Sequence, residues 1–250
     1  MRAFLDTNAL MGSLSTDMLL SCAEKPFIVY RPYWNSHVLK ELRHHLPEII
    51  ARQPDPVDDP VMAAERRIKA MSKAFPRASV AGWQAYLPET ESLVNDPFDA
   101  PILAGALASK ANVLVTENLK DFQRALIRER YGIDVTNESS FLSLLLDNNT
   151  SRTTRALIAM TEGHHDPPRN LKELHARCLE IPELALFGRA LEQSVSDRCA
   201  ERMREMFRSA RYGAQGRDRL GRFTAKPFHG SEDVMPPDGI WGWDGNGPAL

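Results

Sequence analysis

The feature that most constrains the fold is the alternation of short apolar runs with helical patterns over the first 150 residues. Three runs, Ala3–Leu5, Phe27–Tyr30 and Val113–Val115, are continuous and rich in branched or aromatic side chains. Such runs are typical of strands buried on both faces of a parallel sheet. A further short strand is predicted over Ile133–Val135. Because strands that alternate with helices imply right-handed crossovers, we predict an α/β protein with a central parallel sheet in a three-layer α/β/α arrangement.

Helical periodicity fills the segments between these strands. Asn35 or Ser36 is placed to cap a helix whose apolar residues recur at three-to-four spacing from Val38 to Ile50. Other predicted helices cover Pro60–Lys73, Ser79–Tyr86, Ile102–Ala108 and a stretch that includes Phe141–Leu146.

Beyond about residue 150 the strand pattern stops and only helical patterns remain. The GHHDPP segment at Gly163–Pro168 is predicted to break them. From Tyr212 the composition shifts to Gly, Pro, Arg and Asp, which favours a disordered tail. We therefore predict an α/β domain over 1–150, a helical extension over 151–210 and a tail over 211–250. The predicted helices of the extension are Thr153–Met160, Leu171–Ile181 and Glu183–Phe207.

Charge and composition exclude several classes of protein. A formal net charge of −2 argues against a histone-like, non-specific nucleic-acid binder, although it leaves room for a local basic cleft. The three cysteines are widely spaced without a CxxC motif, which suits a reducing cytosol and offers no zinc site. No signal sequence is evident, and no apolar run approaches the ~20 residues that span a bilayer. We expect a soluble, cytoplasmic protein that does not bind membranes.

The acids of most interest lie where apolar runs end. Asp6 directly follows the first strand, in FLDTNAL, and Asp121 follows the NVLV strand, in TENLKDF. Asp99 lies just before the helix that leads into that strand, in DPFDAPILAGAL, and Glu41 lies on the helix after the second strand. Ligands collect at the carboxyl ends of the strands in open parallel sheets. We therefore expect these four acids to meet at one rim of the sheet.

A group of carboxylates without Lys or Arg partners is a problem that a metal ion solves. Such groups repel one another and raise their own pKa values. A hard cation such as Mg²⁺ or Mn²⁺ prefers oxygen ligands and keeps several waters. It can activate a water for attack on a phosphodiester and stabilise the leaving oxygen. The sequence contains no His/Cys ligand set, GxSxG or Walker A pattern. The acids therefore favour metal-dependent phosphodiester hydrolysis.

The order and spacing of four motifs resemble those of the PIN-domain ribonucleases. The motifs are FLDTNAL, HVLKELRHHL, DPFDAPILAGAL and TENLKDF, and the likeness is closest to toxins of VapBC-type toxin–antitoxin modules. It extends through AFPRASVAGW and DPPRNLKELHARCLEIPELALFGRAL, and so covers roughly residues 1–192.

This resemblance implies a PIN-like fold and a Mg²⁺- or Mn²⁺-dependent endoribonuclease that cuts tRNA, rRNA or mRNA. It also implies a small antitoxin protein whose tail occupies the acidic cleft, and a homodimer. The residues that match the family's acids, and hence the implied catalytic and metal-ligating groups, are Asp6, Glu41, Asp99 and Asp121. The residues that match its supporting polar positions are Asn8, Thr116 and Asn118.

Departures from the family pattern leave an alternative open. Asn118 stands where many relatives carry an acid, and Ala100-Pro101 follows Asp99 where a subgroup has a basic residue and a histidine. A PIN-like protein that binds RNA or a partner without cutting is therefore the alternative. Asp6 after a first strand also suits a haloacid-dehalogenase-like phosphatase. That chemistry needs an acid at the position of Asn8, so we discount it.

Overall fold

A computed structural model describes residues 1–12, 14–52, 57–163, 168–196, 215–217 and 223–225. The chain divides into two compact units, Met1–Glu192 and Gln193–Leu250. In the second unit, β6 (Gln215–Arg217) and β7 (Phe223–Ala225) pair as antiparallel strands. The remainder of the predicted tail lies outside the described residues. All of the acids predicted to form a site belong to the first unit.

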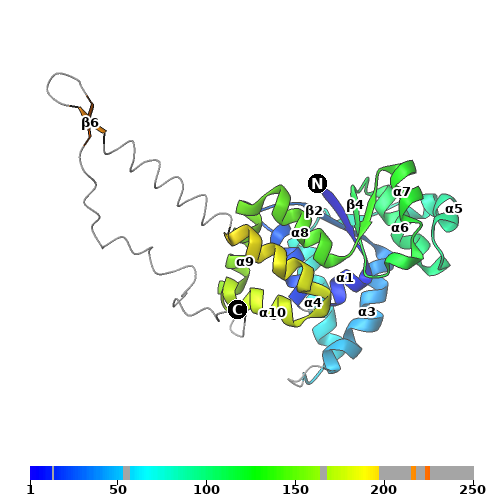
Figure 1. The fold of residues 1–250 in the computed structure, drawn as a ribbon. Helices are drawn as coiled ribbons and strands as arrows, with labels where there is room; N and C mark the ends of the chain where they lie inside the picture. Colours follow the sequence, from blue (N-terminus) through cyan, green and yellow to red (C-terminus); the bar gives the residue numbers. More distant parts are fainter. Residues whose placement is uncertain (13, 53–56, 164–167, 197–214, 218–222, 226–250) are drawn as a thin grey trace. The chain divides into compact units, whose positions relative to one another are not determined.

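The first unit is built on a five-stranded, all-parallel sheet with the order β3-β2-β1-β4-β5 (Figure 1). Its strands are β1 (Arg2–Leu5), β2 (Arg31–Asn35), β3 (Ser79–Val80), β4 (Val113–Val115) and β5 (Asp134–Thr136). The predicted parallel α/β architecture is therefore confirmed. Because β1 is the central strand, the residue that follows it, Asp6, lies in the middle of the carboxyl edge of the sheet.

The prediction for the second strand was wrong. The apolar run Phe27–Tyr30 is not a strand, and β2 begins only at Arg31. Ile28 has a φ of +43°, a left-handed conformation that β-branched residues rarely adopt and that an extended strand excludes. The run therefore forms a loop that leads into β2, and its Tyr30 ring is buried against Phe141 instead.

The predicted helix over Ser79–Tyr86 was also wrong in its first half. Ser79 and Val80 form β3, which pairs with the end of β2, and only Trp83–Tyr86 is helical, as a short 3₁₀ turn. Pairing with a neighbouring strand outweighed the local helical pattern here, as tertiary context often does. The last strand, β5, lies one residue later than the predicted Ile133–Val135.

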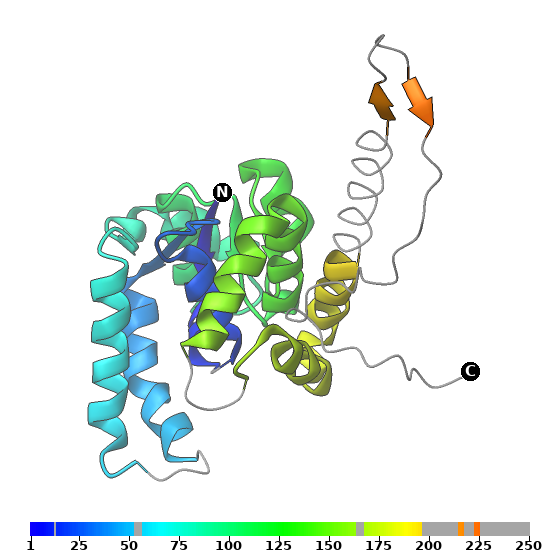
Figure 2. The same cartoon turned by 90° about the vertical axis from the view of Figure 1, so that its left-hand side faces the viewer.

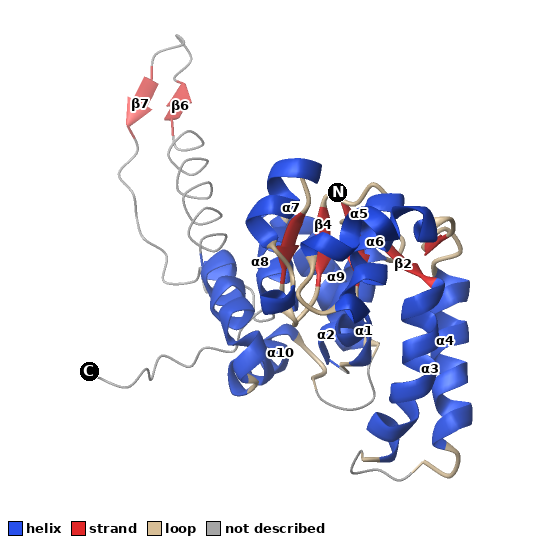
Figure 3. Cartoon of the chain, turned by 90° about the vertical axis from the view of Figure 1, so that its right-hand side faces the viewer, coloured by secondary structure: helices blue, strands red, loops and turns tan. Residues whose placement is uncertain are grey.

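Helices cover both faces of the sheet (Figures 1 and 3). On one face α6 lies against β1, β2 and β4, and on the other α2 packs on β2 and contacts α8 and α9. The helices are α1 (Thr7–Met11), α2 (Leu14–Ala23), α3 (Ser36–Ala51), α4 (Pro60–Ala74), α5 (Leu87–Thr90), α6 (Ala100–Ala108), α7 (Arg124–Tyr131), α8 (Glu138–Asn148), α9 (Thr150–Glu162) and α10 (Leu171–Glu180).

The helices predicted in the C-terminal part correspond to α9, α10 and helical residues over 185–196. Residues 164–167 and 197–207 of those predictions lie outside the described part of the chain. Because α9 and α10 belong to the same compact unit as the sheet, the structure draws no boundary near residue 150. None of the helices within the described residues has the length and apolar character needed to cross a bilayer.

A close contact sets the position of α6 on the sheet. A β-carbon at Gly105 would overlap the ring of Phe4 on β1 and the side-chain amide of Asn35 at the end of β2. The missing side chain therefore lets α6 approach the strands, and this brings Asp99, at the start of α6, to the carboxyl edge.

Asn35 joins two helices at that edge. Its Oδ1 accepts a hydrogen bond from the Val38 backbone N–H and caps α3, while its Nδ2 donates to the Pro101 carbonyl in the first turn of α6. The Asn35 side chain is fully buried, so both bonds are shielded from water. Helix α3 also packs along α4, as Figure 2 shows. The start of α3, which carries Glu41 one turn further on, is thereby fixed relative to Asp99.

Candidate active site

Asp6 is the most buried of the predicted acids, with 4% of its surface exposed. Its backbone N–H donates to the Val115 carbonyl and so continues the pairing of β1 with β4. Its Oδ1 accepts from the Thr7 backbone N–H at 2.6 Å, and its Oδ2 accepts from the Thr116 hydroxyl at 2.7 Å. Burial raises the pKa of Asp6 to about 6 in spite of these hydrogen bonds, and the charge of Glu41 adds to the rise.

Thr116 connects the polar residues around Asp6. Its hydroxyl donates to Asp6 and accepts from Asn8 Nδ2 at 3.3 Å and from the Asn118 backbone N–H at 3.1 Å. Asn8 Oδ1 in turn accepts from the Glu117 backbone N–H at 3.2 Å. These bonds tie the loop after β1 to the loop after β4. The predicted supporting residues therefore orient the carboxylate of Asp6.

The charges of several neighbouring acids act on Asp99. It is half-buried at the end of a 3₁₀ turn, Pro97–Asp99, and its Oδ2 accepts from Asn118 Nδ2 at 3.1 Å. Burial and, after it, the negative charges of four nearby acids together raise its pKa to about 7. Those acids are Asp6, Asp121, Asp96 and Glu41. Asp99 occupies the N-cap position of α6, but its side chain makes no capping hydrogen bond and remains available for other partners.

Glu41 is held by two groups. Its Oε2 accepts from the Thr7 hydroxyl, and its Oε1 lies 3.3 Å from His37 Nε2, one turn earlier on α3. Burial pushes its pKa upward, but the contact with the His37 imidazole, the hydrogen bond from Thr7 and the charge of His45 outweigh burial and leave the pKa lowered. Glu41 is therefore a charged carboxylate beside more easily protonated ones. His37 was not predicted, although its spacing of four residues from Glu41 on a helix was a usable signal.

Asp121 lies on the loop that follows β4. It ends the 3₁₀ turn Leu119–Asp121, and its carbonyl accepts from the Asn95 backbone N–H at 2.6 Å. An isolated bridge between Val94 and Phe122 fixes this loop beside the segment that leads to Asp99. Its charge raises the pKa of Asp99, so the two acids are electrostatically coupled.

The carboxyl edge also carries an acid, Glu138, that was not predicted from the sequence. Glu138 begins α8 after a single residue, Asn137, that follows β5 at the same carboxyl edge, and it is only 6% exposed. Burial raises its pKa to about 7, opposed by a hydrogen bond with Ser15 and reinforced by the charges of Glu117 and Asp6. The rule that selected Asp6, an acid placed where a strand ends, would also have selected Glu138.

The donor set at this edge suits a hard divalent cation. No Lys or Arg forms an ion pair with Asp6, Asp99 or Asp121 within the described residues. Carboxylates that raise one another's pKa bind a cation that cancels the repulsion, and their oxygens are the ligands Mg²⁺ and Mn²⁺ prefer. In the part of the chain that is described, no three His, Cys, Asp or Glu side chains are gathered tightly enough to hold a metal by themselves. The residues therefore fit an ion bound by one or two carboxylates, with water and substrate oxygens as its other ligands.

Comparison of the chain with protein-family models, with curated proteins and with solved structures finds no match. The class of the protein accordingly rests on the fold and the site: a parallel α/β protein with buried, mutually repelling carboxylates at the carboxyl edge of its sheet.

Proposed function

We propose that the chain is a metal-dependent endoribonuclease that hydrolyses RNA phosphodiester bonds with Mg²⁺ or Mn²⁺. One observation carries the proposal. Asp6 and Asp99 come from segments more than 90 residues apart, and burial together with like charge raises the pKa of both. Strongly perturbed carboxylates gathered at the ligand-binding edge of a parallel sheet are typical of an active site.

The roles of individual residues follow from their contacts. Asp6 and Asp99 would hold the ion, and the charges of Glu41 and Asp121 also act on Asp99. A bound Mg²⁺ or Mn²⁺ supplies an activated water and stabilises the charge on the leaving oxygen. Thr116 and Asn118 fix the orientations of the Asp6 and Asp99 carboxylates, as supporting groups do around other metal sites. Thr7 and His37 keep Glu41 charged and in place.

The resemblance of four motifs to toxins of VapBC-type modules supports a cytoplasmic toxin restrained by a small antitoxin protein. In such a pair the antitoxin would cover the acidic edge. A homodimer is part of the same expectation.

The test compares the wild-type chain with Asp6→Asn and with a matched control, Asp96→Asn. Asp96 caps the turn before Asp99 through a hydrogen bond from the Phe98 N–H, and asparagine caps equally well. We expect wild type and Asp96→Asn to cleave total RNA with Mg²⁺ or Mn²⁺ and to stop growth when expressed. Asp6→Asn should cleave at least about 1,000-fold more slowly, which is about 4 kcal/mol of lost transition-state stabilisation.

Equal cleavage by wild type and Asp6→Asn would contradict the proposal. The amide of Asn118 bonds Asp99 at a position where many relatives carry a carboxylate, and this favours a non-cutting RNA-binding protein as the second candidate. That alternative predicts RNA binding by the wild type with no cleavage in either metal.

A further inference from the structure

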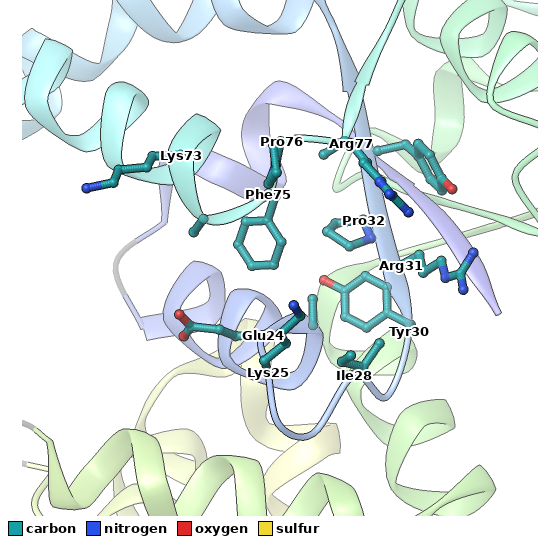
Figure 4. Close-up of a pocket in the computed structure, with 14 residues that line it drawn as sticks. Glu24, Lys25, Ile28, Tyr30, Arg31, Pro32, Lys73, Phe75, Pro76 and Arg77 are labelled. Atoms are coloured by element: carbon teal, nitrogen blue, oxygen red, sulfur yellow. The ribbon is translucent and has the colours of Figure 1, made fainter.

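A concave region lies at the amino-terminal edge of the sheet, opposite the edge that carries the acids. It is a cavity of about 730 Å³ between the loop before β2, the first residues of β2 and the segment that joins α4 to β3. Figure 4 shows Phe75, Tyr30 and Pro32 around the open space, with Ile28 and Lys25 on its other side. The buried Tyr30 donates its hydroxyl to the Leu19 carbonyl, so it forms a fixed floor. The cavity is within the size range of small-ligand sites.

The rim of this cavity is strongly basic. A smaller cavity lined by Met1, Arg2 and the Ile28–Arg31 segment adjoins it and shares Ile28, Tyr30 and Arg31 with it. The two together carry one acid, Glu24, and a set of basic side chains that forms no ion pair within the described residues. These basic side chains are Arg2, Lys25, Arg31, Lys73 and Arg77. We refer to the two cavities with these five residues as the basic groove.

Aromatic rings accompany the positive charge. Tyr33 lines the groove, and the Arg2 guanidinium lies 5.0 Å from the centre of its ring. Phe75 is partly exposed and packs edge-on against the buried Trp34, 6.0 Å between ring centres. Positive charge along a groove, together with aromatic rings that accept a stacked base, is the usual means of binding single-stranded nucleic acid.

With the charge distribution of this chain, an enzyme that acts on RNA would need a basic surface away from its acids. The chain has a net charge of −2, and its carboxyl edge gathers acids that repel a polyanion. Affinity for RNA comes mostly from neutralised phosphates, so it must come from elsewhere on the surface. Strand β1 begins with Arg2, at the basic groove, and Asp6 follows its last residue, so four residue steps of about 3.3 Å, or about 13 Å, separate Arg2 from Asp6.

We propose that the basic groove binds a single-stranded segment of RNA that flanks the scissile bond, and so anchors a substrate whose cleavage takes place at the carboxyl edge. This inference rests on the proposed function for its choice of ligand. The basic residues contact phosphates, and Phe75 or Tyr33 stacks with a base. An acidic peptide would satisfy the charges but would leave the partly exposed rings of Phe75 and Tyr33 without a stacking partner, which is why RNA is the favoured occupant.

The test measures binding of a fluorescein-labelled 12-nucleotide polyuridine RNA by anisotropy, in EDTA and in an Asp6→Asn background, so that no cleavage is needed. Arg31→Ala/Arg77→Ala should bind about tenfold more weakly at 0.1 M salt, and the slope of log K against log salt should fall by about 1.4. The matched control is Lys172→Ala/Arg189→Ala, which removes two exposed charges far along the chain from the groove. The control should change neither value.

A third variant separates stacking from charge. Phe75→Leu keeps an apolar side chain but removes the ring. It should weaken binding about fivefold or more and leave the salt slope unchanged. Thermal melts establish that every variant used is folded.

An unchanged salt slope in Arg31→Ala/Arg77→Ala, or an equal loss in the control, would overturn the inference. Competition by deca-glutamate as effective as that by unlabelled RNA would also overturn it, in favour of an acidic protein partner. Cleavage by wild type with no groove effect leaves the nuclease proposal standing without this inference. If the groove variants bind RNA more weakly but wild type cleaves no RNA, the RNA-binding inference is supported and the nuclease proposal is rejected.

Discussion

The two edges of the same parallel sheet differ in charge and in how their side chains are held. At the carboxyl edge, acids such as Asp6 are buried and hydrogen-bonded, and burial and mutual repulsion raise the pKa values of two of the proposed ligands. At the amino edge, the basic groove surrounds an open cavity with basic side chains that lack ion-pair partners in the described part of the chain. The first arrangement fixes the positions of the carboxylates, and the second attracts a negatively charged ligand without fixing its orientation.

This difference follows from the topology. In a parallel sheet all strands point the same way, so the residue that follows each strand lies at the same edge, the carboxyl edge. Three neighbouring strands place polar side chains there in this way: β1 with Asp6, β4 with Thr116 and β5 with Glu138 after one intervening residue. The amino edge is formed by the loops that lead from the helices into the strands, and exposed basic side chains such as Arg77 and Arg31, the first residue of β2, lie there. Precise chemistry is therefore expected at one edge and substrate attraction at the other.

The largest expected effect is on cleavage, and it comes from a substitution at the carboxyl edge alone. Asp99→Asn should reduce metal-dependent cleavage by at least about 1,000-fold, because it removes a proposed ligand while Asn118 can still donate to the new amide oxygen. RNA binding in EDTA should not fall, since the basic groove is untouched. Cleavage rates and anisotropy on the same preparation give both numbers. A parallel loss of RNA binding would mean that the two edges are not separate.

The next effect concerns the helix that carries Asp99. Gly105→Ala should destabilise the fold by about 3 kcal/mol, because the new methyl group overlaps Phe4 and Asn35 and α6 must move outward. The control is Gly163→Ala, where a β-carbon meets only ordinary contacts at 3.5 Å, and its effect should stay within about 0.5 kcal/mol. Urea unfolding measures both. Equal midpoints for the two variants would show that the contact at Gly105 does not fix α6.

Much of the carboxyl edge of the sheet could be predicted from the sequence because the evidence for it is local. A short apolar run ending in an acid is visible at Asp6, and the continuous run Val113–Val115 was located to the residue. The cap of α3 was narrowed to Asn35 or Ser36, and the structure selects Asn35. Each of these features depends on neighbours within a few positions.

The amino edge was not predicted because its features depend on contacts that are distant in sequence. The apolar pattern of Phe27–Tyr30 predicts a strand. Only the left-handed conformation of Ile28 and the packing of Tyr30 on Phe141 show that it is a loop. The cavity itself joins residues 23–33 with residues 73–78, which no spacing rule brings together. His37 and Glu138 were not predicted although local signals exist for both: His37 lies four residues before Glu41 on a helix, and Glu138 lies two residues after the last residue of β5.

The smallest effect tests the burial of charge at the carboxyl edge through pH. The pKa of Asp6 is about 6 in the folded protein against 3.8 for an ordinary aspartate, so the folded state binds its proton more tightly than the unfolded state. Asp6 therefore favours folding below about pH 4, and this contribution is lost as the pH rises to about 6. In EDTA at pH 8, Asp6→Asn should be more stable than wild type by about 1–3 kcal/mol, and the difference should shrink toward zero near pH 4.

Urea unfolding of both proteins between pH 4 and pH 8 measures this difference directly. Arg31→Ala/Arg77→Ala provides the comparison with the other edge, where exposed charges should give a difference from wild type that stays flat over the same range. Saturating Mg²⁺ should stabilise wild type at pH 8 and leave Asp6→Asn nearly unchanged, because an ion bound by Asp6 favours the folded state. A stability difference for Asp6→Asn that does not vary with pH would show that the carboxylate is not penalised by burial. The contrast between the two edges would then be one of charge alone.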